Sequence, residues 1–248
     1  MGRLRLARRV AAMAFALLLC LPFHYAWKLA GRRSPWPRRF LAMAAWATGM
    51  RWQVTGTPLP APALFLANHA SWLDILLLAG TSGASFVSKA EVADWPVFGW
   101  LAGMHETVFV AREQKRAVHS QADALRAALA GGRAVALFPE GTTDGGRDTL
   151  PFRASLLSAL FPPLPGLKVQ PVAIDYGEAV HEIEWVGRES ARSNVGRILA
   201  RKGSTRVRIH FLAPVDPAIA GDRKILAERS RAEILERLHP SGEAADRL

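Results

Sequence analysis

His69 and Asp74, which follow an apolar run of the chain, are the residue types of a general base and its orienting partner. If Ser71 is the N-cap of the next helix, His69 lies in the loop before it. Asp74 is then the third helical residue and leans back across the open helix end toward the imidazole. An aspartate on one ring nitrogen fixes the tautomer, and the other nitrogen can take a proton from an attacking hydroxyl. The structural alternative is a capping box of Ser71 and Asp74 beside a polar loop histidine.

A second segment that could carry chemistry is Phe138-Pro-Glu-Gly-Thr-Thr143, which also follows an apolar run. Glu140, Gly141 and Thr142 bring a carboxylate, an accessible backbone and a hydroxyl to one loop. Such a loop can hold a glycerol hydroxyl or a phosphate. An ordinary turn is the alternative. The sequence contains no Gly-x-Ser-x-Gly, P-loop, His-Glu-x-x-His or Cys-x-x-Cys motif that would indicate other chemistry.

The elements that must position these residues are short apolar runs alternating with stretches of helical spacing. This alternation predicts an α/β fold with a mainly parallel sheet wrapped by helices, whose strand ends carry the site. We expect an N-terminal region over residues 1–50, the main domain over 51–220 and a C-terminal surface helix and tail over 221–248. The predicted strands are 63–67, 85–88, 107–110, 134–138, 169–174 and 207–211, and the predicted helices are 71–79, 114–130 and 222–238.

Positive charge is concentrated at the front of the chain. The formal net charge is +11, and no acidic residue precedes Asp74, so the rest of the chain carries only +1. A basic front end indicates either nucleic acid or anionic lipid as the partner. Lipid is favoured over nucleic acid, because the basic residues bracket an apolar run. The ten basic residues are Arg3, Arg5, Arg8, Arg9, Lys28, Arg32, Arg33, Arg38, Arg39 and Arg51.

The apolar run itself, from Val10 to Trp27, is marginal in length for crossing a bilayer. A shorter apolar stretch, Phe40 to Met50, follows a basic loop over residues 31–39. Two apolar helices joined by a basic loop predict a hairpin in one leaflet, whose Arg and Lys side chains meet lipid phosphates. A single true crossing is the alternative. Cys20, the one cysteine, excludes an internal disulfide and is expected to be an apolar filler.

Together these segments resemble the glycerolipid acyltransferase family that includes 1-acyl-sn-glycerol-3-phosphate acyltransferases. The resemblance covers about residues 64–176 and preserves the order and spacing of four blocks. These blocks are Asn68-His69 with Asp74, Val108-Phe-Val-Ala-Arg112, Phe138-Pro-Glu-Gly-Thr142 and Val169-Gln-Pro-Val172.

The resemblance implies a role for each matching residue. His69 would be the general base, Asp74 its orienting partner, and Arg112 the group that pairs with the acceptor's phosphate. Glu140, Gly141 and Thr142 would hold the glycerol end of the acceptor. Members of the family take the acyl group from acyl-carrier protein or acyl-coenzyme A and need no metal or other cofactor. The implied fold is a mixed sheet wrapped by helices, with an N-terminal pair of apolar helices on the membrane.

One departure bears on the acceptor. Many phosphatidate-forming members read Pro-Phe-Lys-x-Gly after the third block, whereas this chain reads Pro151-Phe-Arg-Ala-Ser155 after an insertion at 144–148. This looks closer to the branch that acylates lyso-ornithine lipid, in which Arg112 would meet a carboxylate. We expect acyl transfer to lysophosphatidic acid at the cytoplasmic face of the inner membrane, with lyso-ornithine lipid as the alternative acceptor. An alternative from another class is a non-catalytic membrane-bound module that keeps the fold.

Overall fold

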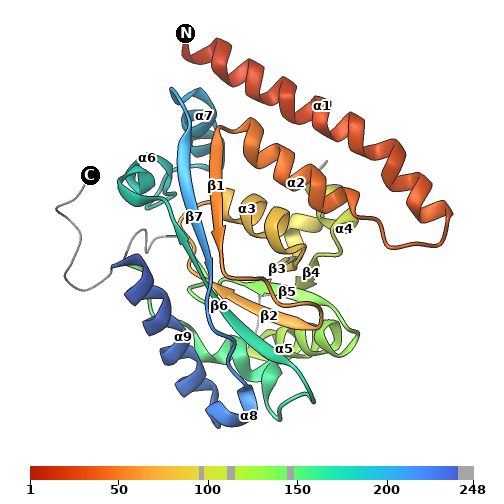
Figure 1. The fold of residues 1–248 in the computed structure, drawn as a ribbon, viewed down its shortest axis with the longest axis vertical. Helices are drawn as coiled ribbons and strands as arrows, with labels where there is room; N and C mark the ends of the chain where they lie inside the picture. Colours follow the sequence, from red (N-terminus) through yellow and green to blue (C-terminus); the bar gives the residue numbers. More distant parts are fainter. Residues whose placement is uncertain (95–97, 111–114, 144–147, 240–248) are drawn as a thin grey trace.

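A computed structural model describes residues 1–94, 98–110, 115–143 and 148–239 of the chain (Figure 1). Within these residues seven strands form one sheet in the order β1-β7-β6-β2-β5-β3-β4. The strands are β1 (Met50–Thr55), β2 (Ala63–Ala67), β3 (Ser85–Lys89), β4 (Val108–Val110), β5 (Ala134–Leu137), β6 (Lys168–Asp175) and β7 (Thr205–Phe211).

Helices precede, connect and follow these strands. The α-helices are α1 (Gly2–Leu29), α2 (Trp36–Ala47), α3 (Leu73–Ser82), α4 (Phe98–Met104), α5 (Lys115–Ala130), α6 (Val180–Ile183), α7 (Ala191–Ala200), α8 (Pro217–Ala220) and α9 (Arg223–Leu238). The short 3-10 helices are η1 (Ala90–Asp94), η2 (Ala154–Leu160) and η3 (Gly177–Ala179).

The sheet is mixed but mainly parallel, which confirms the predicted fold class. Every neighbouring pair of strands is parallel except β6 and β7, which are antiparallel. The central strand β2 is fully buried and pairs with both β5 and β6. The carboxyl ends of these three strands therefore meet at one edge of the sheet, where the loop after each strand can contribute to one site.

Two apolar cores lie on the two faces of the sheet. Alternate side chains of β2 enter each core, with Phe65 on the face covered by α2 and α3 and Leu64 on the face covered by α5, η2 and α9. Helix α3 lies unusually close to α2, since a Cβ at Gly80 would come within 2.9 Å of the Ala42 Cα atom. Close helix packing therefore holds the element that carries Asp74.

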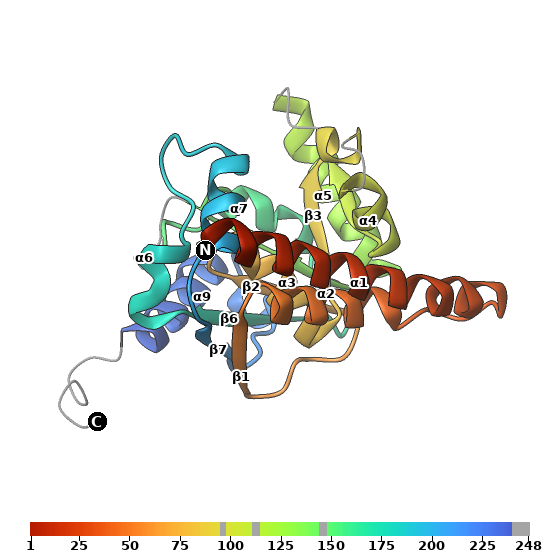
Figure 2. The ribbon, with the colours of Figure 1, turned by 90° about the horizontal axis from the view of Figure 1, so that it is seen from above.

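The predicted helical pair at the N-terminus is present, with different bounds. Helix α1 begins eight residues before the apolar run and ends two residues after it, and α2 begins at Trp36, inside the predicted loop. Pro37 in the first turn explains this start, because proline is pre-organised for that position. Figures 1 and 2 show α1 and α2 side by side, with the outer end of the hairpin extending past the body of the molecule. By length and composition, α1 could cross a membrane.

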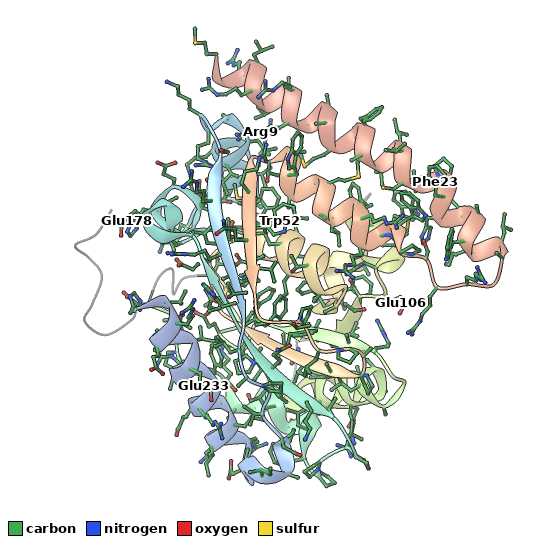
Figure 3. The ribbon with its side chains drawn as sticks, viewed as in Figure 1. Arg9, Phe23, Trp52, Glu106, Glu178 and Glu233 are labelled. Carbon is green, nitrogen blue, oxygen red and sulfur yellow. The ribbon has the colours of Figure 1, made fainter. Side chains whose placement is uncertain are left out.

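The basic residues of the front end do not all serve lipid, which corrects that part of the prediction. Arg9 is buried and donates to the carbonyls of Ile198, at 2.9 Å, and Gly203, at 2.7 Å. Arg5 donates to the Ala200 carbonyl at 2.9 Å. Both guanidinium groups thus satisfy carbonyls at the C-terminal end of α7, where the helix dipole favours a cation. Figure 3 shows Arg9 on the side of α1 that faces α7 and the top of β1.

Two further arginines of this group have the same kind of partner. Arg38 donates to the carbonyls of Gly80 and Thr81 near the end of α3, and Arg51 donates to the Trp46 carbonyl near the end of α2. These bonds join the helical hairpin to the main domain. They are therefore structural contacts of the folded protein.

Strand β1 was not predicted from the sequence. Its side chains from Arg51 to Thr55 are mostly exposed, so the strand lacks the apolar run by which the others were found. It pairs in parallel with β7 at the edge of the sheet, and its backbone hydrogen bonds hold it there.

Candidate active site

The site begins where β2 ends, at Asn68. Its side-chain amide donates to the Ile174 carbonyl at 3.0 Å, and its carbonyl oxygen accepts from the Ile174 amide at 2.8 Å. The buried side chain thereby continues the pairing of β2 with β6 one step beyond the strand. This contact fixes the point at which the chain leaves the sheet for His69.

The structure brings His69 and Asp74 into direct contact. The distance from His69 Nδ1 to Asp74 Oδ2 is 2.9 Å. The predicted helix start is corrected, because α3 begins at Leu73 and Asp74 is its second residue. Trp72 is the residue before the helix, and Ser71 Oγ lies 3.4 Å from the Leu73 amide. The helix starts later than predicted because the chain first makes a turn. Asp74 still faces back toward the imidazole.

Asp74 also bonds backbone amides of the turn that precedes α3, although α3 has no side-chain cap of the kind that the structural alternative expected. Its Oδ2 atom accepts from the amides of Ala70, at 2.8 Å, and Ser71, at 2.9 Å, in addition to the imidazole. Its Oδ1 atom accepts from the Tyr176 hydroxyl at 2.5 Å. The side chain is fully buried, so these donors replace the water that an ionised carboxylate needs. One carboxylate therefore contacts both the turn before α3 and the imidazole, and its orienting role remains a prediction.

The imidazole of His69 is held between the carboxylate and an aromatic surface. Its ring stacks on Phe138, with 3.9 Å between centroids and 12° between planes, and Phe86 stacks behind Phe138. Because a carboxylate only accepts hydrogen bonds, Nδ1 carries the proton, and the lone pair is on Nε2. The side chain keeps 16% of its surface exposed. A substrate hydroxyl can therefore approach the ring.

Glu140 lies behind His69 and joins two loops. One carboxylate oxygen accepts from the His69 amide at 2.8 Å, and the other accepts from the Leu150 amide at 2.8 Å. Burial raises the pKa of Glu140 from 4.5 to about 7, although both backbone hydrogen bonds oppose that shift. The predicted ligand of a glycerol group is thus already engaged with the backbone, and it connects the first block to the third.

Gly141 and Thr142 follow directly in that loop and are partly exposed. Gly141 has φ of +74°, and a Cβ there would come within 3.1 Å of the Arg153 guanidinium carbon. The positive φ favours glycine, whereas the exposed guanidinium could move aside. Arg153 is exposed, and its guanidinium lies next to Gly141.

A third segment of the chain closes the loops from the side. The Trp185 amide donates to the Ala70 carbonyl at 2.9 Å, and the Thr143 hydroxyl donates to the Trp185 carbonyl. Asn194 on α7 accepts from the Trp72 indole at 3.1 Å. Helix α7 and the loop before it therefore hold both motif loops in place.

Arg112 lies outside the described residues, as do residues 144–147 of the insertion. The second block is represented by β4 alone. Among the described residues, no group of three or more His, Cys, Asp and Glu side chains is placed to hold a metal ion.

Tyr176 and Trp185 are the site residues that the sequence interpretation did not identify. Tyr176 stands one residue beyond β6, at the same sheet edge as His69 and Glu140. The strand-end rule that located the other loops could have found it. Trp185 contributes through its backbone, and its residue type gives no signal for that contact.

Comparisons with known proteins agree with this geometry. A sequence profile of the family described as "Acyltransferase" matches residues 51–175. The lyso-ornithine lipid O-acyltransferase of Rhodobacter capsulatus is 34% identical, over 94% of this chain and 90% of that protein. The 1-acyl-sn-glycerol-3-phosphate acyltransferase of Neisseria meningitidis is 33% identical, over 71% of this chain and 69% of that protein.

A solved structure shares the fold. The crystal structure of the 1-acyl-sn-glycerophosphate (LPA) acyltransferase from Thermotoga maritima has a TM-score of 0.72 to this chain. It is 20% identical, and the match covers 98% of this chain and all of that one. At this level of identity the likeness concerns the arrangement of the elements.

Proposed function

The chain belongs to the acyltransferase family, and from that premise we propose that it transfers a fatty acyl group from an acyl thioester to the free hydroxyl of a lysolipid, with His69 as the general base. The membership confirms the resemblance that the four motif blocks predicted. The observation that carries the proposal is the contact between His69 Nδ1 and Asp74 Oδ2 at the end of the central strand. It orients a partly exposed imidazole with its second nitrogen available.

The proposed reaction is a single acyl transfer. His69 Nε2 takes the proton of the acceptor hydroxyl while that oxygen attacks the thioester carbonyl carbon. The carbon–sulfur bond then breaks, and the imidazolium returns its proton to the leaving thiolate. Asp74 stabilises the imidazolium between these steps. A thioester is already activated, so the enzyme needs no nucleophile of its own.

Around this centre the remaining motif residues are proposed to bind the acceptor. Gly141 and Thr142 are partly exposed in the loop that Glu140 fixes, and they are proposed to offer backbone and hydroxyl groups to the headgroup. Arg112 is proposed to pair with the anionic group of the acceptor. Glu140 is proposed to hold the loop in position beneath that headgroup, since both its oxygens already accept from backbone amides.

The proposed location is the cytoplasmic face of the inner membrane, with α1 lying in one leaflet. Large apolar side chains remain exposed along α1, among them Phe15, Leu18 and Phe23. Figure 3 shows Phe23 toward the outer end of the helix, away from Arg9. The buried contacts of Arg9 hold the other end on the main domain. A helix that lies in the plane of the membrane places these apolar side chains in lipid and keeps the Arg9 contacts with the main domain. A helix that crosses the membrane would separate α1 from α2 over part of its length.

Two acceptors are proposed for the test. Lysophosphatidic acid, the acceptor predicted from the sequence, agrees with the name of the Neisseria meningitidis relative. Lyso-ornithine lipid is the second candidate, because the Rhodobacter capsulatus relative of that name matches 94% of this chain, against 71% for the other. The donor is proposed to be acyl-carrier protein or acyl-coenzyme A.

The test is an assay of the purified full chain with labelled acyl thioester, offering both acceptors side by side in mixed vesicles. We expect transfer to at least one acceptor, loss of transfer by more than about 1000-fold in His69→Ala, and unchanged vesicle binding. His181→Ala is the matched control, because His181 is exposed on α6. Turnover retained in His69→Ala contradicts the mechanism, and an inactive wild-type protein favours the non-catalytic module.

A further inference from the structure

Tyr176 contacts the proposed catalytic pair from a distant part of the sequence. Its hydroxyl lies 2.5 Å from Asp74 Oδ1, and the two residues are 102 positions apart. The chain reaches this point through β6, whose pairing with β2 is continued by the two hydrogen bonds between Asn68 and Ile174. The register of the two central strands therefore determines where the phenol is placed.

The bonding of Asp74 is divided between its two oxygens. Oδ2 accepts from the amides of Ala70 and Ser71 and from the imidazole of His69. Oδ1 accepts from Tyr176. The Tyr176 ring belongs to the core on the α2 and α3 face of the sheet, so packing fixes the direction of its hydroxyl. A carboxylate held from both sides cannot rotate Oδ2 away from the imidazole.

We propose that Tyr176 is a positioning residue of the acyl transfer reaction, and that its hydroxyl keeps the Asp74 carboxylate turned toward His69. The inference rests on the proposed function of that pair. Without the phenol, Oδ1 would be a buried acceptor that lacks a donor, and the carboxylate could turn Oδ2 away from the imidazole, which would weaken its stabilisation of the imidazolium.

The phenol is suited to this task because it remains a donor. Burial, together with the nearby Asp74 charge, raises the pKa of Tyr176 well above its ordinary value of 10. It is therefore neutral over the working range of the enzyme. Other charged groups lie close by. Glu140 contacts the His69 backbone, and Asp175, the neighbour of Tyr176 in sequence, is paired with Arg208 at 2.9 Å.

The first test compares Tyr176→Phe with Tyr25→Phe. The chain has only these two tyrosines, and Tyr25 is exposed on α1. We expect Tyr176→Phe to lower kcat by about 10- to 100-fold with KM for both substrates unchanged, as for loss of a hydrogen bond to a charged group. The acid limb of its kcat profile should move to higher pH. Tyr25→Phe should leave both quantities as they are in the wild type.

The second test asks whether Tyr176 acts through Asp74. In an Asp74→Asn background the same Tyr176→Phe change should lower the residual kcat by less than about twofold, because the carboxylate it serves is gone. A full additional loss in that background would overturn the proposal. So would a Tyr176→Phe enzyme with a lower melting temperature but wild-type kcat and pH profile, which is the result for a purely structural tyrosine.

A third measurement keeps a phenol hydroxyl at position 176 and does not depend on the folding of Tyr176→Phe. Growth on 3-fluorotyrosine in the Tyr25→Phe background places fluorine at position 176 alone. The fluorinated phenol is a stronger donor, so we expect the acid limb of kcat to move to lower pH. Its ¹⁹F resonance should shift when Asp74→Asn is introduced and stay in place with His181→Ala. An unmoved resonance or acid limb overturns the proposal.

These outcomes separate two kinds of failure. A wild-type protein that transfers no acyl group to either acceptor contradicts the proposed function. An active wild-type protein whose kcat, pH profile and fluorine resonance ignore the changes at Tyr176 contradicts this inference alone.

Discussion

At the scale of single residues, Asp74 serves the backbone and the imidazole with the same oxygen atom. An isosteric Asp74→Asn change keeps one oxygen for the amides of Ala70 and Ser71 but removes the negative charge. The imidazolium of His69 then loses its counter-charge. We expect kcat to fall by about 1000-fold or more, with little change in KM.

The control for this prediction is Asp216→Asn. Asp216 caps a helix, α8, and pairs with Lys168, but it lies outside the candidate site. Its variant should retain the wild-type kcat. A kcat within tenfold of wild type for Asp74→Asn would mean that the carboxylate only holds the turn before α3.

Glu140 makes the free energy of unfolding depend on pH in a definite direction. Its pKa is raised from 4.5 to about 7, so the folded protein binds this proton more tightly than the unfolded chain does. The contribution of Glu140 to the free energy of unfolding is fully present below pH 4.5. As the pH rises toward about 7, up to about 3 kcal/mol of this contribution is lost.

The Glu140→Gln variant tests this sign. Glutamine keeps one acceptor oxygen and loses the other, so at about pH 5 the variant should be less stable than wild type by about 1–2 kcal/mol. By about pH 8 the difference should shrink or reverse, because the variant buries no charge. Urea unfolding at both pH values measures it. A difference that is constant, or that grows with pH, contradicts the raised pKa.

The sequence predicted the pairing of His69 with Asp74 because both residues sit within one short loop and helix start. It did not predict that Glu140 would accept a hydrogen bond from the His69 amide, or that the Tyr176 hydroxyl would donate to Asp74. Those contacts join loops from different strands, and they depend on the register of β2, β5 and β6. Residue type and spacing along one chain carry no information on that register.

At the scale of elements, α1 is joined to the main domain by a buried arginine. Arg9→Gln removes a guanidinium that serves three carbonyls, those of Ile198, Leu199 and Gly203. Carbonyls at a helix C-terminus are costly to leave without donors. We expect the free energy of unfolding to fall by about 2–3 kcal/mol, and α1 to become accessible to trypsin in the absence of lipid.

The neighbouring Arg8→Gln is the matched control, because Arg8 is exposed on the same helix turn. It should leave unfolding and proteolysis unchanged and weaken binding to anionic vesicles slightly, in a salt-dependent way. Equal stability of the two variants would show that the Arg9 contacts do not hold α1 in solution.

Elements differ in how well the sequence predicts them. The buried strands β2, β5 and β6 were predicted closely, because continuous apolar runs mark strands buried on both faces. Strand β1 and helix α7 were not predicted. Neither contains a continuous apolar run, and both are held by partners distant in sequence, β7 for β1 and α1 for α7.

At the scale of the whole molecule, the basic residues of the front end fall into two groups. Part of the basic front end holds the helical hairpin against the domain, while Arg3, Arg8 and Arg32 remain exposed. Their placement around an apolar run predicted lipid for all of them. That pattern could not separate the two groups, because the bonded arginines find their acceptors only where α2, α3 and α7 end in the folded chain.

The membrane-facing surface is predicted to be the exposed apolar side of α1. Phe15 and Leu18 are each 67% exposed in the structure without lipid. Burying such side chains in the acyl region contributes about 1.5–3 kcal/mol each. The double change of Phe15 and Leu18 to glutamate should therefore reduce partitioning onto anionic vesicles by about 100-fold or more, with the melting temperature nearly unchanged.

The control for this surface is Ile219→Glu. Ile219 is 81% exposed on α8, at the end of the molecule away from α1 in Figure 1. It presents a similar apolar side chain to solvent, but in-plane insertion of α1 leaves it in water. Vesicle sedimentation and acyl transfer should therefore match wild type. Equal losses in the two proteins would mean that lipid binds exposed apolar residues without regard to α1.

The double variant should regain transfer when the acceptor is offered above its critical micelle concentration in detergent, because His69 and Asp74 are unaltered and only delivery of the lipid has been lost.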